Sequence, residues 1–294
     1  MINYSVIIPH KNCLNLLKRC LDSIPIRSDL EIIVVDDNSD IENVRSKILS
    51  LSSNPLLKIV TLKTTYFAGG ARNFGLKLAT GKWIIFADAD DFFSEDAFLI
   101  MDEYLNSFFD IVYFSHKAVY SDDLQPAERL GARNKYIHEF KTTHSDKSSD
   151  YLKYLNHSPA SKMIKHKIII DNDLKFDEVP ASNDAMFSVL TAYYAVSIEV
   201  DTRVVYIATI RRGSITQTRN KINDYSRFCV DIRLYDFFRS KKLYHLYPFV
   251  TMWVLNSLRY YGFCEFFKYM KLAHKYNINI FLGLTRRFSK RYKY

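Results

Sequence analysis

Residues 83–91, WIIFADADD, place three carboxylates directly after a short apolar run. An apolar run of about four to eight residues that ends in acids is typical of a buried strand in an α/β sheet, where ligands bind beyond the carboxyl ends of strands. In an extended chain, Asp88 and Asp90 point the same way, which suits one Mg²⁺ or Mn²⁺ ion shared with phosphate oxygens. The alternative is a strand-to-helix turn in which Asp91 or Ser94 caps the helix.

Three more strand-like runs precede this stretch, and helical patterns separate them. The run at 5–12, SVIIPHKN, is stopped by Pro9 and followed by apolar residues at helical spacing. The run at 31–40, EIIVVDDNSD, again ends in acids, and the run at 56–62, LLKIVTL, leads to a helix predicted for 71–79. Four strands that alternate with helices predict a mostly parallel, Rossmann-like α/β sheet with right-handed crossovers.

Five segments in combination resemble the inverting glycosyltransferases of family 2, which use nucleotide-sugar donors and have the GT-A fold. The segments are SVIIPHKN (5–12), IIVVDDNS (32–39), GGARNFGLKLATGKWIIFADADDFF (69–93), FDEVPASNDAMFS (176–188) and VVYIATIRRGSIT (204–216). The resemblance implies a GT-A catalytic domain at 1–218, with a nucleotide-sugar-binding half at 1–115 and an acceptor half at 116–218. Residues 219–294 lie outside it and are predicted to form a helical C-terminal extension.

The resemblance also implies donor-binding roles for residues in the first half of that domain. Asp37 would lie near the uracil or other base of the nucleotide, and Arg72 of the ARN tripeptide beside the base or the phosphates. Asp88 would bind the ribose hydroxyls, and Asp90 would hold the metal ion, Mn²⁺ or Mg²⁺. Pro9, at the end of SVIIP, completes the implied donor-binding set.

Asp184 matches the acid that serves the family as general base, although Asn183 stands where the family usually has Glu. A carboxylate suits this role because it can take the proton of an attacking hydroxyl group within hydrogen-bond reach. A divalent cation would neutralise charge on the leaving diphosphate, and one base with an in-line displacement inverts the anomeric centre. The residues alone leave another interpretation open, in which Ser182, Asn183 or Asp184 is the N-cap of a helix at 185–195.

Four further side chains have both a functional and a structural interpretation. Arg211 and Arg212 precede Gly-Ser and suit a diphosphate clamp, or they form a solvated basic turn. Lys162 in ASKMI resembles a family position near the acceptor subdomain, but a lone lysine is more often on the surface. Lys11 replaces the aromatic residue that the family commonly has before Asn12, so it meets a phosphate or points to solvent.

Composition indicates a folded protein without an export signal. The 294 residues are 48% apolar, which suffices for one large α/β domain and an appendage. The chain enters a strand at Ser5, which leaves no room for a signal peptide, and it has no uninterrupted apolar stretch of about 18 residues. The four cysteines form no CxxC pair. We therefore expect reduced core thiols in a cytoplasmic protein, with no membrane span.

The composition changes twice along the chain. Residues 116–150 are polar, with Pro126 and Gly131, and are predicted to form a long variable connection beside the acceptor site. Residues 219–294 contain 16 Lys and Arg against 4 Asp and Glu, or +12, whereas residues 1–218 contain 25 against 28, or −3. The basic region also holds 20 of the 44 aromatic residues, which favours an amphipathic helix in peripheral contact with a membrane. The alternative is a helical pair packed on the catalytic domain.

Other protein classes explain less of the sequence. A nucleic-acid-binding protein would account for the basic, aromatic region but not for the acidic strand ends, which repel nucleic acid. A sugar-nucleotide pyrophosphorylase would need a glycine-rich, Arg-containing loop after Ile8, which this sequence lacks. A non-catalytic protein with this fold is a third alternative. The resemblance implies a metal-dependent hexosyl- or N-acetylhexosaminyltransferase with a nucleotide diphospho-sugar donor, and we expect this donor to be a UDP-sugar. Its acceptor would be a glycan or lipid-linked chain of a bacterial surface polysaccharide such as capsule or O-antigen.

Overall fold

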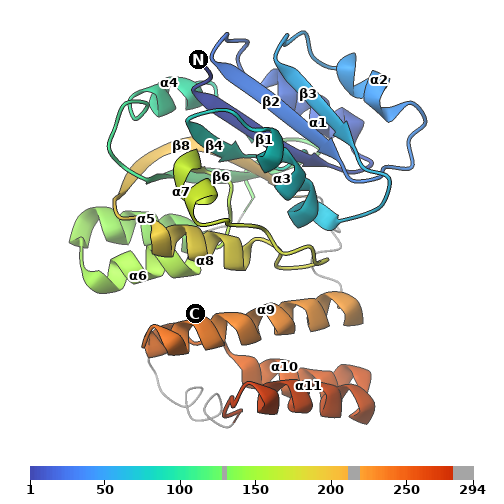
Figure 1. Cartoon of the computed structure of the whole chain (residues 1–294), viewed down its shortest axis with the longest axis vertical. Helices are drawn as coiled ribbons and strands as arrows, with labels where there is room; N and C mark the ends of the chain where they lie inside the picture. The colour runs from blue at the N-terminus through green and yellow to red at the C-terminus, as the bar shows by residue number, and fades with distance from the viewer. Residues whose placement is uncertain (128–130, 211–218, 281–294) are drawn as a thin grey trace. The chain divides into compact units, whose positions relative to one another are not determined.

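The computed structural model describes residues 1–127, 131–210 and 219–280 (Figure 1). In these ranges the chain forms two compact units. The first, at 1–179 and 183–210, is built on a β-sheet, whereas the second, at 180–182 and 219–280, is helical. Arg211 and Arg212, the predicted diphosphate clamp, lie outside the described residues.

A single sheet organises the first unit, with its strands in the order β3-β2-β1-β4-β7-β6-β8-β5. The strands are β1 (Tyr4–His10), β2 (Leu30–Asp36), β3 (Leu57–Thr61), β4 (Trp83–Phe86), β5 (Phe92–Phe93), β6 (Ile111–Tyr120), β7 (Lys162–Lys165) and β8 (Ile198–Ile210). Parallel pairing joins β3, β2, β1 and β4, so the predicted parallel arrangement is confirmed in this half. Beyond β4, the strands β7 and β5 pair antiparallel with their neighbours, which the sequence did not predict.

Helices cover both faces of this sheet. They are α1 (Leu14–Asp22), α2 (Val44–Leu49), α3 (Phe67–Leu78), α4 (Ala97–Asp102), α5 (Gly131–Thr143), α6 (Asp146–Leu155), α7 (His166–Asp171) and α8 (Ala185–Tyr194). Successive residues of a strand point to opposite faces. Val6 of β1 therefore packs in one apolar cluster with Leu17 of α1, whereas Ile7 packs in another with Ala71 of α3. Burial of both faces explains why these strands are nearly continuous apolar runs.

Pro9 does not stop β1, which continues to His10 with Pro9 in register with Val35. The expectation was wrong because the sheet opens on the other side of β1 at this point. The Ile7 carbonyl oxygen faces β4 and accepts the N–H of Ala87 at 3.1 Å, and pairing with β4 then ends. Pro9, two residues further on, faces the same side, so its missing N–H removes no ladder hydrogen bond.

Residues 116–150 do not form the long connection that their polarity predicted. They complete β6 and then form α5 and the first half of α6, with 128–130 outside the described ranges. Ile137 of α5 and Leu152 of α6 are fully buried in the same apolar cluster as Ile7. The prediction failed because a short amphipathic helix exposes polar residues over most of its surface, so its composition resembles that of a loop.

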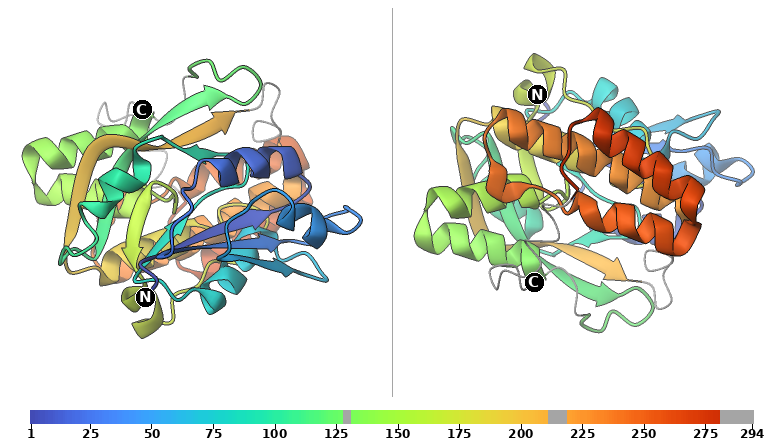
Figure 2. Two further views of the ribbon diagram at one scale, coloured as in Figure 1. Left: turned by 90° about the horizontal axis from the view of Figure 1, so that it is seen from above. Right: turned by 90° about the horizontal axis from the view of Figure 1, so that it is seen from below.

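The second unit consists of α9 (Lys221–Ser240), the short 3₁₀ helix η2 (Tyr244–Leu246), α10 (Val250–Tyr261) and α11 (Phe263–Lys275). The side chain of Asn220 caps α9 by accepting the N–H groups of Ile222 and Asn223. Helices α10 and α11 lie side by side (Figure 2, right), and the rings of Phe228 and Tyr269 stack with their centres 4.3 Å apart. No helix within the described residues is long and apolar enough to span a bilayer.

All four cysteines lie in described parts of the chain, and each is a free thiol. Cys20 of α1 is buried, whereas Cys264 of α11 is exposed. The expectation of four core thiols was therefore wrong for Cys264, because this position faces outward on its helix.

Gly69 allows α3 to approach the segment 177–183 closely. A Cβ atom at this position would lie 2.0 Å from the carbonyl oxygen of Asp177 and 2.9 Å from the Cβ atom of Asn183. The closer contact is with backbone, which cannot rotate away as a side chain would. Glycine is therefore needed here for the close approach of two backbones.

We predict that Gly69→Ala lowers the free energy of unfolding by about 1–3 kcal/mol, because overpacking forces the backbone to shift. Gly131→Ala is the matched control, since no atom outside its own helix backbone lies within 4 Å of a Cβ added there. Urea unfolding followed by circular dichroism measures both variants. Equal unfolding midpoints for the two variants would contradict the role given to Gly69.

Candidate active site

The DADD sequence follows β4 as a turn and not as extended chain. β4 ends at Phe86, and the N–H of Asp91 donates to the Asp88 carbonyl oxygen at 3.0 Å. The expectation that Asp88 and Asp90 alternate along a strand was therefore wrong, because pairing with β1 ends at Phe86 and the chain then bends. The three carboxylates still lie beyond the carboxyl end of β4, as predicted.

Two residues of β8 hold this turn. The Tyr206 hydroxyl accepts the N–H of Asp88 at 2.9 Å and donates to the Asp91 carboxylate at 2.9 Å, and the Thr209 N–H donates to the other oxygen of Asp91 at 2.6 Å. Burial, together with the nearby Asp88 charge, raises the pKa of Asp91 well above its usual value. The Ser94 hydroxyl donates to a β8 carbonyl oxygen, so neither Asp91 nor Ser94 caps α4.

Arg19 of α1 supports the same turn, and the sequence analysis missed it. Its guanidinium group donates to the carbonyl oxygens of Asp90 at 2.8 Å and of Ser121 at 3.1 Å. It also lies 5.2 Å from the centre of the Phe92 ring. These contacts fix the backbone of Asp90. Nothing in the local sequence distinguishes Arg19 from any other basic residue near a helix end.

The buried guanidinium group of Arg72 links the two segments that were predicted to carry the chemistry. It donates to the Asp88 carboxylate at 2.5 Å and to the side-chain oxygen of Asn183 at 3.0 Å. It also lies 5.3 Å from the centre of the Phe176 ring. Because Asp184 directly follows Asn183, these hydrogen bonds bring Asp184 to the same end of the sheet as Asp88.

Asn73, the next residue of the ARN tripeptide, fixes the segment that leads to Asp184. Its amide donates to the carbonyl oxygen of Phe176 at 3.0 Å and accepts the N–H of Phe176 at 2.8 Å. The N–H of Asp177 donates to the carbonyl oxygen of Asn183 at 3.1 Å, which closes the loop. The tripeptide thus holds both this loop, through Asn73, and the turn after β4, through Arg72.

Asp184 occupies the N-cap position of α8, but its side chain makes no capping hydrogen bond. In the part of the chain that the structure describes, no group donates a hydrogen bond to its carboxylate. Burial lowers the pKa of His157 and of Lys162, and the negative charge of nearby Asp184 opposes this shift in both. The capping alternative therefore does not explain the carboxylate, which keeps its lone pairs for another partner.

Lys162 is buried, so the surface interpretation was wrong. Its ammonium group donates to the Asn156 carbonyl oxygen at 2.7 Å and lies 5.0 Å from the centre of the Tyr113 ring. Burial and the charge of Arg133 lower the pKa of Lys162 to about 7, while the charge of Asp184 opposes this shift. A titratable cation thus stands beside the predicted base.

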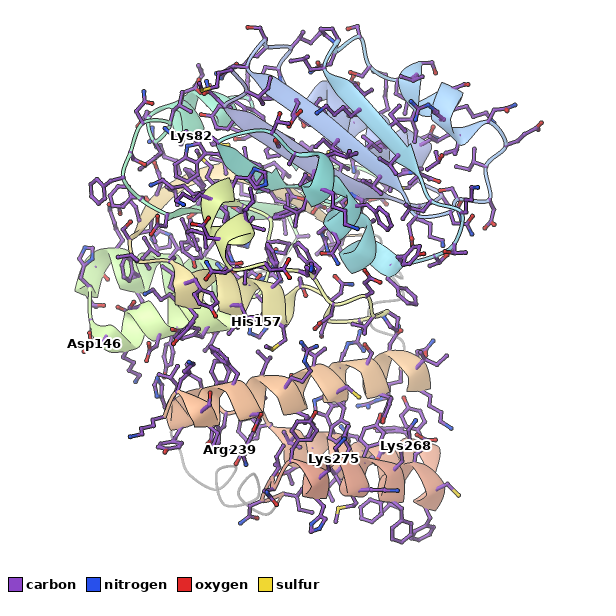
Figure 3. The ribbon with its side chains drawn as sticks, in the orientation of Figure 1. Lys82, Asp146, His157, Arg239, Lys268 and Lys275 are labelled. Carbon is purple, nitrogen blue, oxygen red and sulfur yellow. The ribbon has the colours of Figure 1, made fainter. Side chains whose placement is uncertain are left out.

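Two histidines, His116 and His157, interact electrostatically with Lys162. Burial and the charges of Arg133 and Lys162 lower the pKa of His116 to about 4, and neither of its ring nitrogens has a partner among the described residues. His157, labelled in Figure 3, accepts the hydroxyl hydrogen of Ser188 at its carbonyl oxygen, at 2.5 Å. The sequence analysis missed both histidines because they follow no catalytic or metal-binding spacing.

Asp37 follows β2 directly and so lies beyond the carboxyl end of a strand that runs parallel to β1. Its carboxylate accepts the N–H of Tyr66 at 2.6 Å, and burial raises its pKa. Lys11 donates to the carbonyl oxygen of Asp37 at 3.0 Å and to the hydroxyl of Thr65 at 2.7 Å. Lys11 is therefore hydrogen-bonded to this edge of the site, with 42% of its side chain exposed.

The oxygen donors after β4 suit a hard divalent cation. Within the described residues, no three or more His, Cys, Asp and Glu form a cation-binding group. Mg²⁺ usually takes only one or two protein carboxylates, with phosphate oxygens and water as its other ligands. Asp91 is engaged by β8 and one oxygen of Asp88 by Arg72, so a cation bound at this turn would need phosphate oxygens or water as further ligands.

Known proteins resemble this chain in sequence. The model of glycosyl transferase family 2 matches residues 5–171. A poly(ribitol-phosphate) β-glucosyltransferase of Bacillus spizizenii is 26% identical over 216 residues, which cover 71% of this chain and 32% of that protein. The Escherichia coli UDP-Glc:α-D-GlcNAc-diphosphoundecaprenol β-1,3-glucosyltransferase WfgD is 35% identical over 89 residues, which cover 30% of this chain and 34% of WfgD. This chain therefore spans about a third of the length of these curated relatives.

A solved structure resembles it in fold. The crystal structure of Staphylococcus aureus TarS residues 1–349 in complex with UDP-GlcNAc matches with a TM-score of 0.65 and 20% identity, over 99% of this chain and 76% of that one. The predicted GT-A fold class is thereby confirmed. The family model covers more than half of the chain, from β1 to the end of α7, and this protein therefore belongs to glycosyl transferase family 2.

Proposed function

We propose that this protein is an inverting glycosyltransferase that moves a sugar from a nucleotide diphospho-sugar, first of all a UDP-sugar, to a hydroxyl group of a glycan or lipid-linked acceptor. The product would be part of a bacterial surface polysaccharide. The proposal is carried by the Arg72 side chain, which joins the Asp88 turn to the segment of Asn183 and Asp184.

The names of the relatives support this substrate class. They state glucosyl transfer to poly(ribitol phosphate) in one case and to a diphosphoundecaprenol-linked sugar in another. The TarS crystal structure holds UDP-GlcNAc. WfgD and the TarS structure name a UDP-sugar, and the names of the two glucosyltransferases include a phosphate-containing polymer or carrier.

The donor would bind at the carboxyl ends of the parallel strands, where α/β sheets bind nucleotides. Asp37 after β2 and Asp88 after β4 offer acceptors for the N–H of a base and the hydroxyls of a ribose. Arg72 offers a buried positive charge beside the diphosphate, and Pro9 lies at the same edge of β1. Arg212, outside the described residues, is proposed as a further diphosphate ligand.

Asp184 would act as the general base. Its carboxylate accepts no hydrogen bond from the described residues, so it can receive one from an acceptor hydroxyl group. As the oxygen attacks the anomeric carbon, its proton passes to Asp184, and the bond from that carbon to the diphosphate oxygen breaks on the opposite face. Lys162, while protonated, places a positive charge close to Asp184.

The turn after β4 would stabilise the departing nucleoside diphosphate. When bound, Mn²⁺ or Mg²⁺ at Asp90 would neutralise charge on the departing diphosphate without proton transfer. Tyr206 and Arg19 hold the backbone of this turn, so the carboxylates keep their positions during the reaction. Such preorganised charge is usually the largest single contribution to catalysis.

Nucleotide release from UDP-, GDP- and TDP-sugars, measured with and without acceptor, tests this function. A glycosyltransferase releases the nucleoside diphosphate from its own donor, and acceptor increases the rate. A non-catalytic protein of this fold, or a nucleic-acid-binding protein, releases none from any donor.

In this assay we predict that Asp184→Asn lowers kcat by about 10²- to 10⁴-fold while the donor Kd stays nearly unchanged, because the amide keeps the size but cannot accept the proton. Asp173→Asn, an exposed position with a left-handed backbone that Asn tolerates, is the matched control and should keep wild-type turnover. If Asp184→Asn retains more than about a tenth of wild-type kcat, another group is the base.

We further predict that EDTA abolishes wild-type turnover and that Asp90→Ala lowers kcat by about 10²-fold or more at any metal concentration. Asp88→Ala should chiefly raise the donor Kd. Circular dichroism should show an intact fold in Asp90→Ala, because the contacts of Asp91 with β8 remain. Asp22→Ala, on the surface of α1, is the control. Turnover that resists EDTA, together with an active Asp90→Ala enzyme, would refute the metal assignment.

A further inference from the structure

Three aromatic side chains face outward at the turn between α10 and α11. Tyr260, Phe263 and Phe267 are 43%, 70% and 65% exposed, and they are named here the aromatic surface. Phe263 and Phe267 are four residues apart in α11, so they lie on one face of the helix. Tyr269 and Ala273 are buried in the core of the unit, so α11 is amphipathic with large rings on its outer side.

Basic side chains border the aromatic surface. The guanidinium group of Arg219 lies 3.9 Å from the centre of the Tyr260 ring, and that of Arg259 lies 5.3 Å from it. Further along α11, Lys271, four residues after Phe267, and Lys275 (Figure 3) are exposed. The rings and the cations therefore occur together, with the guanidinium groups directly on Tyr260.

The acidic side chains of this region offset only part of this charge. Glu265 is mostly buried and pairs with Lys221 at 2.8 Å and Lys268 at 3.9 Å. Asp224 is buried, accepts the hydroxyl hydrogen of Tyr261 at 2.8 Å, and pairs with Arg219 at 3.7 Å and Arg227 at 3.0 Å. Across 219–280 there are eleven Lys and Arg against four Asp and Glu. The exposed charge beside the aromatic surface is therefore positive.

We propose that the aromatic surface docks this protein on an anionic lipid bilayer, with Phe263 and Phe267 inserted at the level of the headgroups. Amphipathic helices that lie in this interface combine large apolar rings with Lys and Arg, which attract anionic lipid. Arginines stacked on Tyr260 suit the boundary, where a ring meets the apolar region and a cation meets phosphate. The bilayer would be the inner face of the plasma membrane.

Charge complementarity favours this occupant over a second copy of the chain. Two copies that met through this surface would bring the same cations together, which opposes association. An anionic bilayer instead receives both the rings and the cations. The proposal adds a partner to the proposed function but does not depend on it, because lipid binding can be measured without donor or acceptor.

Point variants test the surface better than deletion of the region after residue 242. Phe228 and Tyr235 of α9 share an apolar cluster with Val254 of α10 and Tyr269 of α11, so deletion would expose the core of the unit. Phe263 and Phe267 have most of their surface in solvent, so serine in their place should leave the fold intact.

The experiment is sedimentation of the full-length protein with vesicles of phosphatidylcholine, with and without phosphatidylglycerol, in low and high salt. We expect binding only to the anionic vesicles and weaker binding in high salt. The double variant Phe263→Ser with Phe267→Ser should lower the partition coefficient by about tenfold or more, because two rings lose apolar burial. Lys271→Gln with Lys275→Gln should lower it by about fivefold or more.

Matched controls carry the same chemical changes elsewhere. Phe108→Ser alters a phenylalanine that is 74% exposed in the first unit, and Lys135→Gln with Lys167→Gln removes two charges from exposed lysines there. Both controls should bind as the wild type does. The proposal is overturned if the wild type binds no vesicles, or if the Phe263 and Phe267 variant binds as well as Phe108→Ser. It is also overturned if that variant converts a wild-type dimer to a monomer without affecting lipid binding.

Discussion

The hydrogen bonds of one buried arginine hold together the two halves of the candidate site. Arg72 connects the Asp88 carboxylate to the Asn183 side chain, and these residues lie 95 positions apart in the chain. A buried guanidinium group needs such partners, because an unpaired charge in the protein interior is strongly destabilising. Satisfying Arg72 therefore requires that the turn after β4 and the segment before α8 meet. The position of Asp184 follows from this requirement.

Much of the fold could be predicted from hydrophobic patterns, because parallel strands buried on both faces are continuous apolar runs. β1, β2 and β4 could be predicted for this reason, and β3, an edge strand that is only partly buried, could be predicted from its apolar residues. The pairing of β7 and β5 could not, since both strands are short and their neighbours are distant in sequence. Polar composition hid α5 and α6, and Pro9 suggested a strand end where the sheet had only opened on one side. In each case the deciding contact was tertiary.

The candidate site, too, was predicted where local motifs carry it and missed where contacts between distant residues decide it. Motifs pointed to Asp88, Arg72 and Asp184, which the structure brings to one end of the sheet, although the extended geometry inferred for the DADD sequence was wrong. The residues that support them were missed, because Tyr206 and Arg19 reach the turn from β8 and α1 and follow no motif. Residue types that donate and accept hydrogen bonds everywhere in a protein gain a role only from their neighbours in space.

The central claim is that the hydrogen bonds from Arg72 to Asp88 and Asn183 position Asp184. The Arg72→Lys variant tests this claim most directly. Lysine keeps the positive charge but lacks the planar fork that reaches two partners at once. If these hydrogen bonds set the position of the base relative to the donor, kcat should fall by at least about tenfold while circular dichroism shows an unchanged fold. Wild-type kcat and donor Kd in a folded Arg72→Lys protein would contradict the account.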